Sequence, residues 1–321
     1  MFTWKKAGKL FDPTRAETPS WMQEFAQAPS VLLFPDYVRI YFSCRPAPDE
    51  KGRYASYSAF VDVNRNNLFE IIRIADQPIL PLGKLGTFDE FGTYPVSAIK
   101  YNEETRLYYG GWTRCESVPF NVAIGMGISS NNGETFIKQG DGPVLSYSPD
   151  EPFILSGPKI RRFNNTWYLF YIAGRKWVLD NGKPEPVYKI RMAHSEDGYH
   201  WVKHNTDLLE NVLEENEAQA SPDVFFYEGK YHMYFCYRGS TNYRGKENGY
   251  RIGYAYSDDL VNWKRDDKQA GITISEEGWD SEMVSYPHVF TLDGKWYMLY
   301  LGNQVGRYGF GLAILDSYKP G

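Results

Sequence analysis

Two stretches of the chain, ASPDVFFYEGKYHMYFCYR at residues 220–238 and SYPHVFTLDGKWYMLYLGN at residues 285–303, follow one pattern. Each places a small or aromatic residue before a proline, continues as an apolar run, and turns at a Glu-Gly or Asp-Gly pair. A second run, rich in tyrosine, follows the turn. Such a pair between two runs of alternating apolar residues predicts a β-hairpin. Each stretch is therefore expected to form two antiparallel strands.

The same pattern occurs five times along the chain. The other three copies are QAPSVLLFPDYVRIYFSCR from Gln27, TYPVSAIKYNEETRLYYGGWTR from Thr93 and SGPKIRRFNNTWYLFYIAGR from Ser156. The proline that anchors each copy recurs at intervals of 66, 63, 64 and 65 residues, at Pro29, Pro95, Pro158, Pro222 and Pro287. Near-equal intervals of this kind indicate a repeat architecture.

Each of the middle copies continues with two more predicted strands. The third strand reads VAIGMGIS, YKIRMAHS or YRIGYAYS, and a turn then leads to a short fourth strand that ends on an aromatic residue, in SNNGETF, SEDGYHW or SDDLVNW. Four antiparallel strands in each of five copies predict an all-β protein, a five-bladed β-propeller. Separate hairpins would instead leave many strand edges exposed.

The last copy lacks its fourth strand. After Pro287 only two further strands follow the first, the last being FGLAIL from Phe310. The N-terminal residues Phe2-Thr-Trp4-Lys-Lys resemble the fourth-strand sequence Val261-Asn-Trp263-Lys-Arg. We therefore expect residues 2–6 to pair with the strand near residues 310–315, and the whole chain, 1–321, to form one propeller domain.

The composition excludes several classes of protein. The chain has 35 Lys+Arg against 40 Asp+Glu, a net charge of −5, and no basic stretch suited to nucleic acid. No apolar run is long enough to span a membrane. The start, MFTWKKAGKLFDP, lacks the apolar core of a secretory signal, and the 3 cysteines have no metal-like spacing. These features predict a cytoplasmic protein with free thiols.

Acidic residues keep register with the repeat. Four of the five copies carry a glutamate five residues before the anchoring proline, at Glu24, Glu90, Glu217 and Glu282. Asp89 and Asp280 lie beside two of them. Because these positions precede the first strand of each blade, they are expected at one end of the central channel, where they form a ring of acids. The alternative is that they cap loops or pair with neighbouring residues.

Arginines mark the ends of the second strands. They lie 16 to 19 residues after the anchoring proline, at Arg45, Arg114, Arg175 and Arg238. The first and second strands are antiparallel, so these arginines are expected at the same end of the channel as the glutamates. Arginine presents a planar fork suited to carboxylate or phosphate. The arginines therefore indicate an anionic sugar as ligand, or structural ion pairs between blades.

Further candidates are aromatic or directly follow a proline. Sugar faces could stack on aromatic residues near the predicted mouth, among them Trp112, Trp279, Tyr94 and Tyr286, although packing is the simpler explanation for most. Asp223 and His288 directly follow their prolines, and one of them is expected to point into the channel. No metal-binding, phosphate-loop or dinucleotide motif occurs, so neither a metal nor a cofactor is expected.

The repeat resembles that of the five-bladed propeller glycosidases, glycoside hydrolase families 43, 32 and 130. Strings such as GKWYMLYLG, KIRMAHSEDGYHW and RIGYAYSDDLVNW are typical of that superfamily. More narrowly, the chain resembles uncharacterised members often found with bacterial surface-polysaccharide genes. The resemblance implies a role in polysaccharide biosynthesis, with a small sugar or nucleotide sugar as substrate.

The carboxylates of family 43 are replaced in this chain. Where that family places a base, a modulator and an acid, the sequence has Ala28, Tyr94 and Ser156. The glutamates in register with the repeat are the available substitutes, and we expect Glu24 and Glu282 to be the acid/base pair, with Glu90 and Glu217 as auxiliaries.

Three functions therefore stay open. The first is a glycoside hydrolase or phosphorylase that acts on an anionic or activated sugar by carboxylate catalysis; a phosphorylase would need only one acid, with phosphate held by arginine. The second is an isomerase, epimerase or lyase that acts on a nucleotide sugar. The third is a sugar-binding propeller without catalysis.

Overall fold

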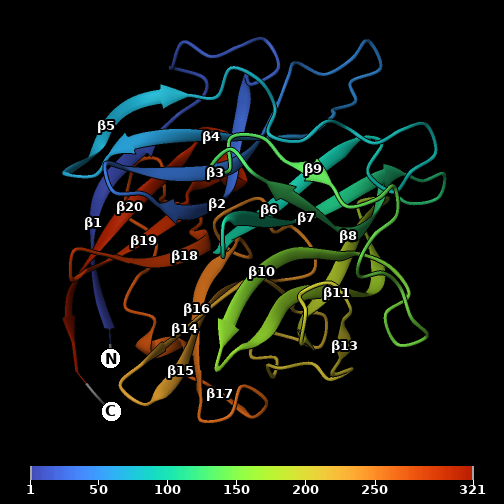
Figure 1. The fold of residues 1–321 in the computed structure, drawn as a ribbon. Coiled ribbons are helices and arrows are strands. Elements are labelled where there is room, and N and C mark those ends of the chain that lie inside the picture. Colours follow the sequence, from blue (N-terminus) through green and yellow to red (C-terminus); the bar gives the residue numbers. More distant parts are fainter. Residues whose placement is uncertain (1, 320–321) are drawn as a thin grey trace.

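The computed structural model describes residues 2–319 and consists of five four-stranded antiparallel sheets arranged around a ring (Figure 1). This is a five-bladed β-propeller, as the repeat predicts. The little helix present comprises a 3-10 turn at Asp267–Gln269 and the short segment α1 at Asn303–Gly306. Each blade contains one copy of the repeat.

The blades follow one another in chain order, and each runs from an inner to an outer strand. The first blade consists of β2 (Glu24–Leu33), β3 (Tyr37–Arg45), β4 (Tyr57–Asn64) and β5 (Asn67–Ile74). The second consists of β6 (Gly92–Tyr101), β7 (Glu104–Arg114), β8 (Phe120–Ser129) and β9 (Ile137–Lys138). The third consists of β10 (Leu155–Phe163), β11 (Thr166–Asp180), β12 (Lys183–Ser195) and β13 (Val202–Lys203). The fourth consists of β14 (Ala218–Tyr227), β15 (Lys230–Arg238), β16 (Arg251–Ser257) and β17 (Trp263–Arg265).

The fifth blade closes the ring as the sequence predicts. Its strands are β18 (Ser285–Leu292), β19 (Lys295–Leu301), β20 (Phe310–Tyr318) and, outermost, β1 (Phe2–Phe11). β1 pairs antiparallel with β20, so that Trp4 lies opposite Leu315. The N-terminal strand is longer than the expected residues 2–6. Buried Trp4 donates its indole N–H to the hydroxyl of Tyr234 in the fourth blade, 2.8 Å away.

The outer strands differ in detail from the prediction. In the second and third blades the fourth strand begins just after the aromatic residue and spans only 2 residues. The β11–β12 hairpin is longer than expected, because β11 continues past Arg175 to Asp180. Its residues beyond Gly174 pair with residues 183–187, which the repeat pattern does not include.

A serine turn before each short outer strand fastens neighbouring blades together. Ser129 and Ser195 accept backbone N–H groups within their turns, which fixes the turn conformation. The carbonyl oxygens of these turns then accept tyrosine hydroxyls from the preceding blade, Tyr41 to Gly133 at 2.7 Å and Tyr108 to Gly198 at 2.5 Å.

Buried apolar side chains fill the spaces between adjacent blades. One cluster joins the fifth, first and second blades and includes Phe11, Phe42 and Phe310. Alternating strand residues supply these side chains, because every second residue of a strand faces the same neighbouring blade. The cysteines Cys44, Cys115 and Cys236 are all free, as expected.

Candidate active site

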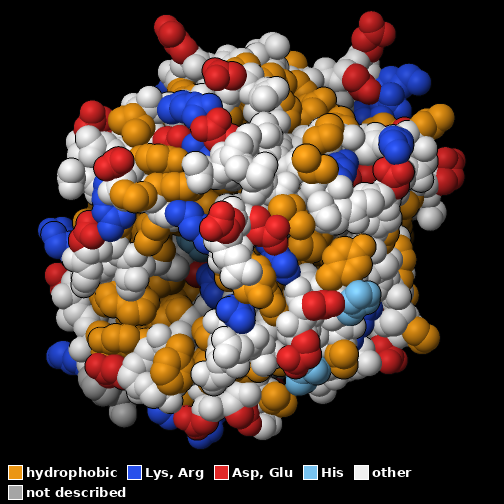
Figure 2. All heavy atoms as spheres, viewed as in Figure 1, with side chains coloured by type: hydrophobic (Ala, Val, Ile, Leu, Met, Phe, Trp, Pro, Cys, Tyr) orange, Lys and Arg blue, Asp and Glu red, His pale blue; other side chains and the backbone are white. Residues whose placement is uncertain are grey.

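The starts of the inner strands and the ends of the second strands lie at one end of the channel, which we call the mouth. Glu24 lies opposite Arg45, Ala218 opposite Arg238, and Gly92 opposite Trp112. The antiparallel pairing thus places the two predicted sets of residues on the same edge of their blades. Figure 2 shows the molecule hollowed to the left of the middle of the view, in the region of β18, with Lys or Arg side chains around the hollow.

Several acids in the loops before the inner strands have basic partners on the outer strands. In four blades, an acid from the loop before the inner strand reaches a base on the outermost strand, and we call this contact the clasp. The pairs are Asp89–Lys138 at 2.5 Å, Glu151–Lys203 at 2.5 Å, Glu217–Arg265 at 2.5 Å and Asp280–Lys6 at 2.6 Å. In three clasps a tyrosine of the second strand also donates to the acid, and these are Tyr109, Tyr171 and Tyr300.

Three other predicted residues also have structural partners. Glu90 accepts the backbone N–H of Gly86 at 3.0 Å and so closes its own loop. Arg175 forms an ion pair with Asp207. Arg114 donates to the backbone carbonyl of Tyr54 at 3.0 Å.

The predicted aromatic residues divide into two groups. Trp279 stacks on Tyr300 with ring centroids 5.1 Å apart, and Trp112 lies against Phe91 at 6.1 Å. Both therefore serve packing. Tyr94 and Tyr286 instead hydrogen-bond to each other at the mouth, where the charge of Arg45 acts on Tyr94.

Arg238 is buried in a nest of tyrosines. Its guanidinium donates to the hydroxyls of Tyr250 at 3.1 Å and Tyr188 at 3.3 Å, and it stacks on the ring of Tyr243. The carbonyl oxygens of Pro186 and Gly239 also accept hydrogen bonds from it. All three nitrogens of Arg238 thus donate to protein acceptors, and the side chain joins the third and fourth blades.

Arg45 is half-buried at the mouth, and no carboxylate among residues 2–319 forms an ion pair with it. Its guanidinium lies over the ring of Phe25 at 4.2 Å and donates weakly to Gln27 at 3.3 Å, while its Nε has no acceptor among the described residues. Burial of the guanidinium lowers the pKa of Arg45 below its ordinary value. The nearby groups that act in the opposite direction and raise this pKa are Tyr94, Tyr54, Tyr286 and Glu24. A half-buried guanidinium with a buried, unpaired Nε is costly, so this position favours an anionic ligand.

The segment α1 joins the lead-ins of the first and fifth blades beside Arg45. Asn303 accepts the backbone N–H of Glu282 at 2.8 Å, and the carbonyl of Val305 accepts the side chain of Gln27 at 2.6 Å. Arg307 forms an ion pair with Glu24 at 2.7 Å. Glu24, Arg45 and Glu282 are thus held around one short segment.

Glu282 differs from the other in-register glutamates. Its backbone is fixed at both ends, because its N–H donates to Asn303 and its carbonyl accepts from Arg251 at 2.9 Å. Its half-buried carboxylate has no hydrogen-bond or ion-pair partner among residues 2–319. Glu24, by contrast, accepts the hydroxyl of Tyr54 at 3.0 Å in addition to its ion pair.

Some backbone conformations at this junction belong to the repeat. Tyr286 has a positive φ of 51°, and φ is also positive at Ala28, Gly157 and Ser221, which likewise precede an anchoring proline, while Phe25 shares its positive φ with Ile154. Val305, in α1, lies outside the repeat, and its φ of 53° is unfavourable for a β-branched residue, so the contacts around α1 enforce it.

A charged cluster lies in the channel on the inner strands. Asp223 and His288 both point inward and lie 3.3 Å apart, and Lys159 joins them, 3.2 Å from Nδ1 of His288. Arg161 also pairs with Asp223. Lys159 is missing from the sequence prediction, although it directly follows Pro158 as Asp223 and His288 follow their prolines.

The contacts of His288 decide its protonation. The backbone N–H of Val31 donates to Nε2 at 3.0 Å, so this nitrogen must carry a lone pair. The proton of the neutral ring is then on Nδ1, which faces Asp223 and Lys159. Burial and the charge of Lys159 lower the pKa of His288 to about 4. Burial likewise lowers the pKa of Lys159 to about 8.

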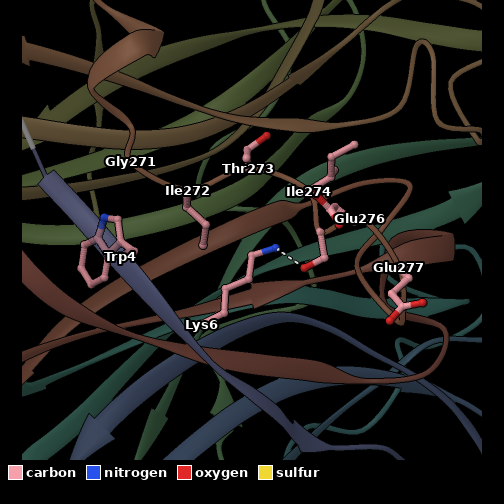
Figure 3. A pocket seen from close by; sticks show the side chains of 9 residues that line it. Trp4, Lys6, Gly271, Ile272, Thr273, Ile274, Glu276 and Glu277 are labelled. Carbon is pink, nitrogen blue, oxygen red and sulfur yellow. Dashed lines mark hydrogen bonds between the residues drawn. The ribbon is translucent and has the colours of Figure 1, made fainter.

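Two clefts lie away from the channel axis. The larger, of about 510 Å³, lies between β1 and residues 271–277, and Figure 3 shows Lys6 pointing across it from β1. The smaller, of about 360 Å³, lies beside the clasp of Asp89 in the second blade. Lys6 is already bound to Ser275 at 2.9 Å, and no predicted catalytic residue lines either cleft.

Metal-binding clusters and membrane-spanning helices are two further features that a site could involve. Among residues 2–319, no three His, Cys, Asp or Glu side chains are grouped so as to hold a metal ion. Within the same residues, no helix has the length and apolar character needed to cross a membrane.

Sequence comparison finds relatives over most of the chain. No family model matches. The uncharacterized protein Rv1502 of Mycobacterium tuberculosis is 34% identical over 319 residues, which cover 98% of this chain and 99% of that protein. The 1,2-beta-oligomannan phosphorylase of Thermoanaerobacter sp. is 24% identical over 263 residues, or 79% of each chain.

Solved structures share the fold. A glycoside hydrolase superposes with a TM-score of 0.74 at 17% identity, covering 99% of this chain and 93% of that one. The beta-1,2-mannobiose phosphorylase from Listeria innocua has a TM-score of 0.69 at 13% identity, with 98% and 96% covered. The resemblance to propeller glycosidases that the sequence indicates is therefore confirmed at the level of fold.

Proposed function

The chain belongs to the same family as Rv1502 of Mycobacterium tuberculosis, and from this premise we propose that it is a carbohydrate-active enzyme that cleaves a glycosidic bond by phosphorolysis. The observation that carries the proposal is that Arg45, whose Nε has no acceptor among the described residues, and Glu282, whose carboxyl has no partner there, belong to the adjoining first and fifth blades beside α1. The curated relative named as a phosphorylase supports the same reaction class.

The reaction needs one acid and one anion. Phosphate, held by Arg45, attacks the anomeric carbon, the bond from that carbon to the leaving oxygen breaks, and Glu282 gives its proton to the leaving oxygen. A new bond joins the sugar to phosphate, so the product is a sugar 1-phosphate. No second carboxylate is required, which agrees with the engagement of Glu24 by Arg307 and Tyr54.

Hydrolysis is the second candidate. It needs a second carboxylate, as base or nucleophile, beside the acid. Glu24 is the nearest available group, because α1 holds it in the same junction as Glu282. This reaction would proceed without phosphate.

The substrate class follows from the relatives and from the charge of Arg45. β-1,2-Linked mannosides are the first substrates to test, because the oligomannan phosphorylase is named for them. A nucleotide sugar is the second, since its diphosphate could occupy the same guanidinium. A role in bacterial surface-polysaccharide biosynthesis would require an activated sugar of this kind.

The test is product analysis with the purified protein. Mannosides, aryl glycosides and nucleotide sugars are incubated with and without inorganic phosphate, and sugar 1-phosphate is followed by phosphorus NMR. Glu282→Gln should lower kcat by about 10²–10⁴-fold. Arg45→Ala should raise the KM for phosphate by about one to two decades, the equivalent of 1.5–3 kcal/mol.

Matched controls come from equivalent positions in other blades. Arg175→Ala removes an ion-paired arginine and Glu90→Gln a loop-closing glutamate, and both should leave the kinetics nearly unchanged. Phosphate-independent release of free sugar, lost in Glu24→Gln, would favour hydrolysis instead. Sugar binding without any turnover would favour a binding propeller, and full activity of Glu282→Gln would refute the assignment of the acid.

A further inference from the structure

The outer strand of the first blade differs from the outer strands of its neighbours. β5 spans 8 residues, whereas β9, β13 and β17 span 2, 2 and 3. β5 is the terminal strand of its sheet, and its outward backbone groups are therefore available to another strand. Figure 1 shows β5 at the rim of the ring.

The side chains of β5 make this edge unusual. Phe69, Ile71 and Ile72 are 44%, 36% and 51% exposed. Figure 2 shows hydrophobic side chains gathered in the upper left of the molecule, where Figure 1 places β5. Exposed apolar residues on a long strand edge indicate a surface that another chain covers.

The other long outer strand provides an internal comparison. β1 spans 10 residues, and its exposed positions are Thr3, Lys5 and Ala7. Lysine on an edge strand is a common protection against pairing with another chain. The same fold position is thus protected in the fifth blade and unprotected in the first.

We propose that β5 pairs antiparallel with β5 of a second copy of this chain, which joins two four-stranded blades into one continuous sheet. The charges of the strand are compatible with a second copy as partner, because the one negative residue, Glu70, and the one positive residue, Arg73, give β5 no net charge. Within the chain, Glu70 accepts a hydrogen bond from Asn64 at 2.9 Å, and Arg73 forms an ion pair with Glu134 at 2.6 Å. A two-fold axis at Ile72 places Glu70 opposite Ile74 and Arg73 opposite Ile71 of the second copy, so that no like charges face each other.

Other arrangements of two copies are less favourable. A parallel pairing in register would place Glu70 beside Glu70 and Arg73 beside Arg73 of the second copy, and like charges directly opposite each other are destabilising. Antiparallel pairing instead brings Ile71 and Ile72 of both copies together at the centre of the interface. The apolar residues that are exposed in the single chain would be buried there.

The test is the molar mass of the full chain in solution over a range of protein concentrations. The wild type should approach twice the chain mass of 37.1 kDa, by sedimentation equilibrium or light scattering. Ile72→Lys should raise the dimer dissociation constant at least about tenfold, because two lysines would meet at the axis. The matched control is Ile137→Lys on β9, where the isoleucine is 76% exposed but the strand has only 2 residues.

Hydrogen exchange then locates the interface. Amides of residues 67–74 should exchange more slowly as the protein concentration rises, and this protection should vanish in Ile72→Lys. Circular dichroism checks that both variants keep the wild-type fold. A wild type that stays at 37.1 kDa throughout overturns the proposal, as does a dimer that Ile72→Lys leaves intact.

Discussion

At the scale of the residue, the position of a residue within the repeat determines which way its side chain points, but not what that side chain does. The residues directly after three of the anchoring prolines, Lys159, Asp223 and His288, all reach the channel and meet there. Because strand residues alternate in direction, one position in the repeat always faces the same way. What each side chain does there depends on its neighbours. Arg161 balances the negative charge of Asp223. The backbone N–H of Val31 donates to Nε2 of His288, so this nitrogen carries no proton and the ring is neutral.

Lys159 gives a prediction about pH and stability. Its pKa of about 8 in the folded protein lies below its ordinary value of 10.5. Between these values the unfolded chain binds more protons, so the free energy of unfolding should rise with pH, by up to about 1.4 kcal/mol per pH unit. Below pH 8 both states are protonated and this contribution is constant.

The measurement compares urea unfolding of the wild type and Lys159→Met from pH 7 to pH 10. Above about pH 8, the free energy of unfolding of the wild type should rise relative to that of Lys159→Met. Lys5→Met, at an exposed position of β1, is the control and should run parallel to the wild type. Parallel profiles for Lys159→Met would contradict the assignment.

At the scale of the element, the clasp accounts for one group of the acids that precede the inner strands. Each short outer strand pairs with only 2 or 3 residues of its neighbour and so has few backbone hydrogen bonds. An ion pair from the loop before the inner strand fastens it, in the second blade through Asp89 and Lys138. The clasp acids lie five to seven residues before the anchoring proline, so blade construction explains only Glu217 among the glutamates at the common offset, and Glu24 and Glu282 lie between the first and fifth blades.

Removing one partner of a clasp should destabilise the protein without affecting the mouth. Lys138→Met leaves the buried carboxylate of Asp89 with only the hydroxyls of Tyr109 and Thr87, and the loss of a buried partner costs roughly 3 kcal/mol. Lys84→Met breaks an exposed ion pair with Asp141 and should cost less than about 1 kcal/mol.

Thermal and urea unfolding give both free energies. The kinetics of any substrate found should be unchanged in folded Lys138→Met. If the two lysine variants lose equal stability, the clasp has no special structural role.

At the scale of the whole molecule, the ring depends on β1. The strand from the N-terminus completes the blade formed by the C-terminal residues, so the two ends of the chain meet in one sheet. Trp4 extends this closure to the fourth blade through Tyr234. Contacts so distant in sequence form only when the ring is complete.

Trp4→Ala should therefore weaken the entire propeller. Loss of a buried tryptophan typically costs about 3–5 kcal/mol, and here it also removes the hydrogen bond to Tyr234. Lys5→Ala, on the exposed face of the same strand, should change the free energy of unfolding by less than about 0.5 kcal/mol. Calorimetry should show a lower Tm for the whole transition of Trp4→Ala. An early separate transition with the main Tm unchanged would mean that closure is only local.

The sequence by itself determined the number of blades, the order of their strands and the closure by residues near Trp4. These follow from local chemistry that repeats, namely a proline, an alternating apolar run and a turn, and each can be read without knowing what lies nearby. The same reading placed Glu24 opposite Arg45 at one edge, because antiparallel pairing follows from the hairpin.

Only the tertiary structure decided which of the equivalent side chains are free. Arg45 and Arg238 lie at the same offset and neither pairs with a carboxylate, yet Nε of Arg45 has no acceptor among the described residues, whereas Arg238 is enclosed by tyrosines from two blades. Glu217 and Glu282 also share an offset, yet only Glu217 meets an arginine on the outer strand. The partners come from loops and outer strands that do not repeat. Whether a charge is available for chemistry is therefore set by contacts between segments far apart in the chain, which no periodicity records.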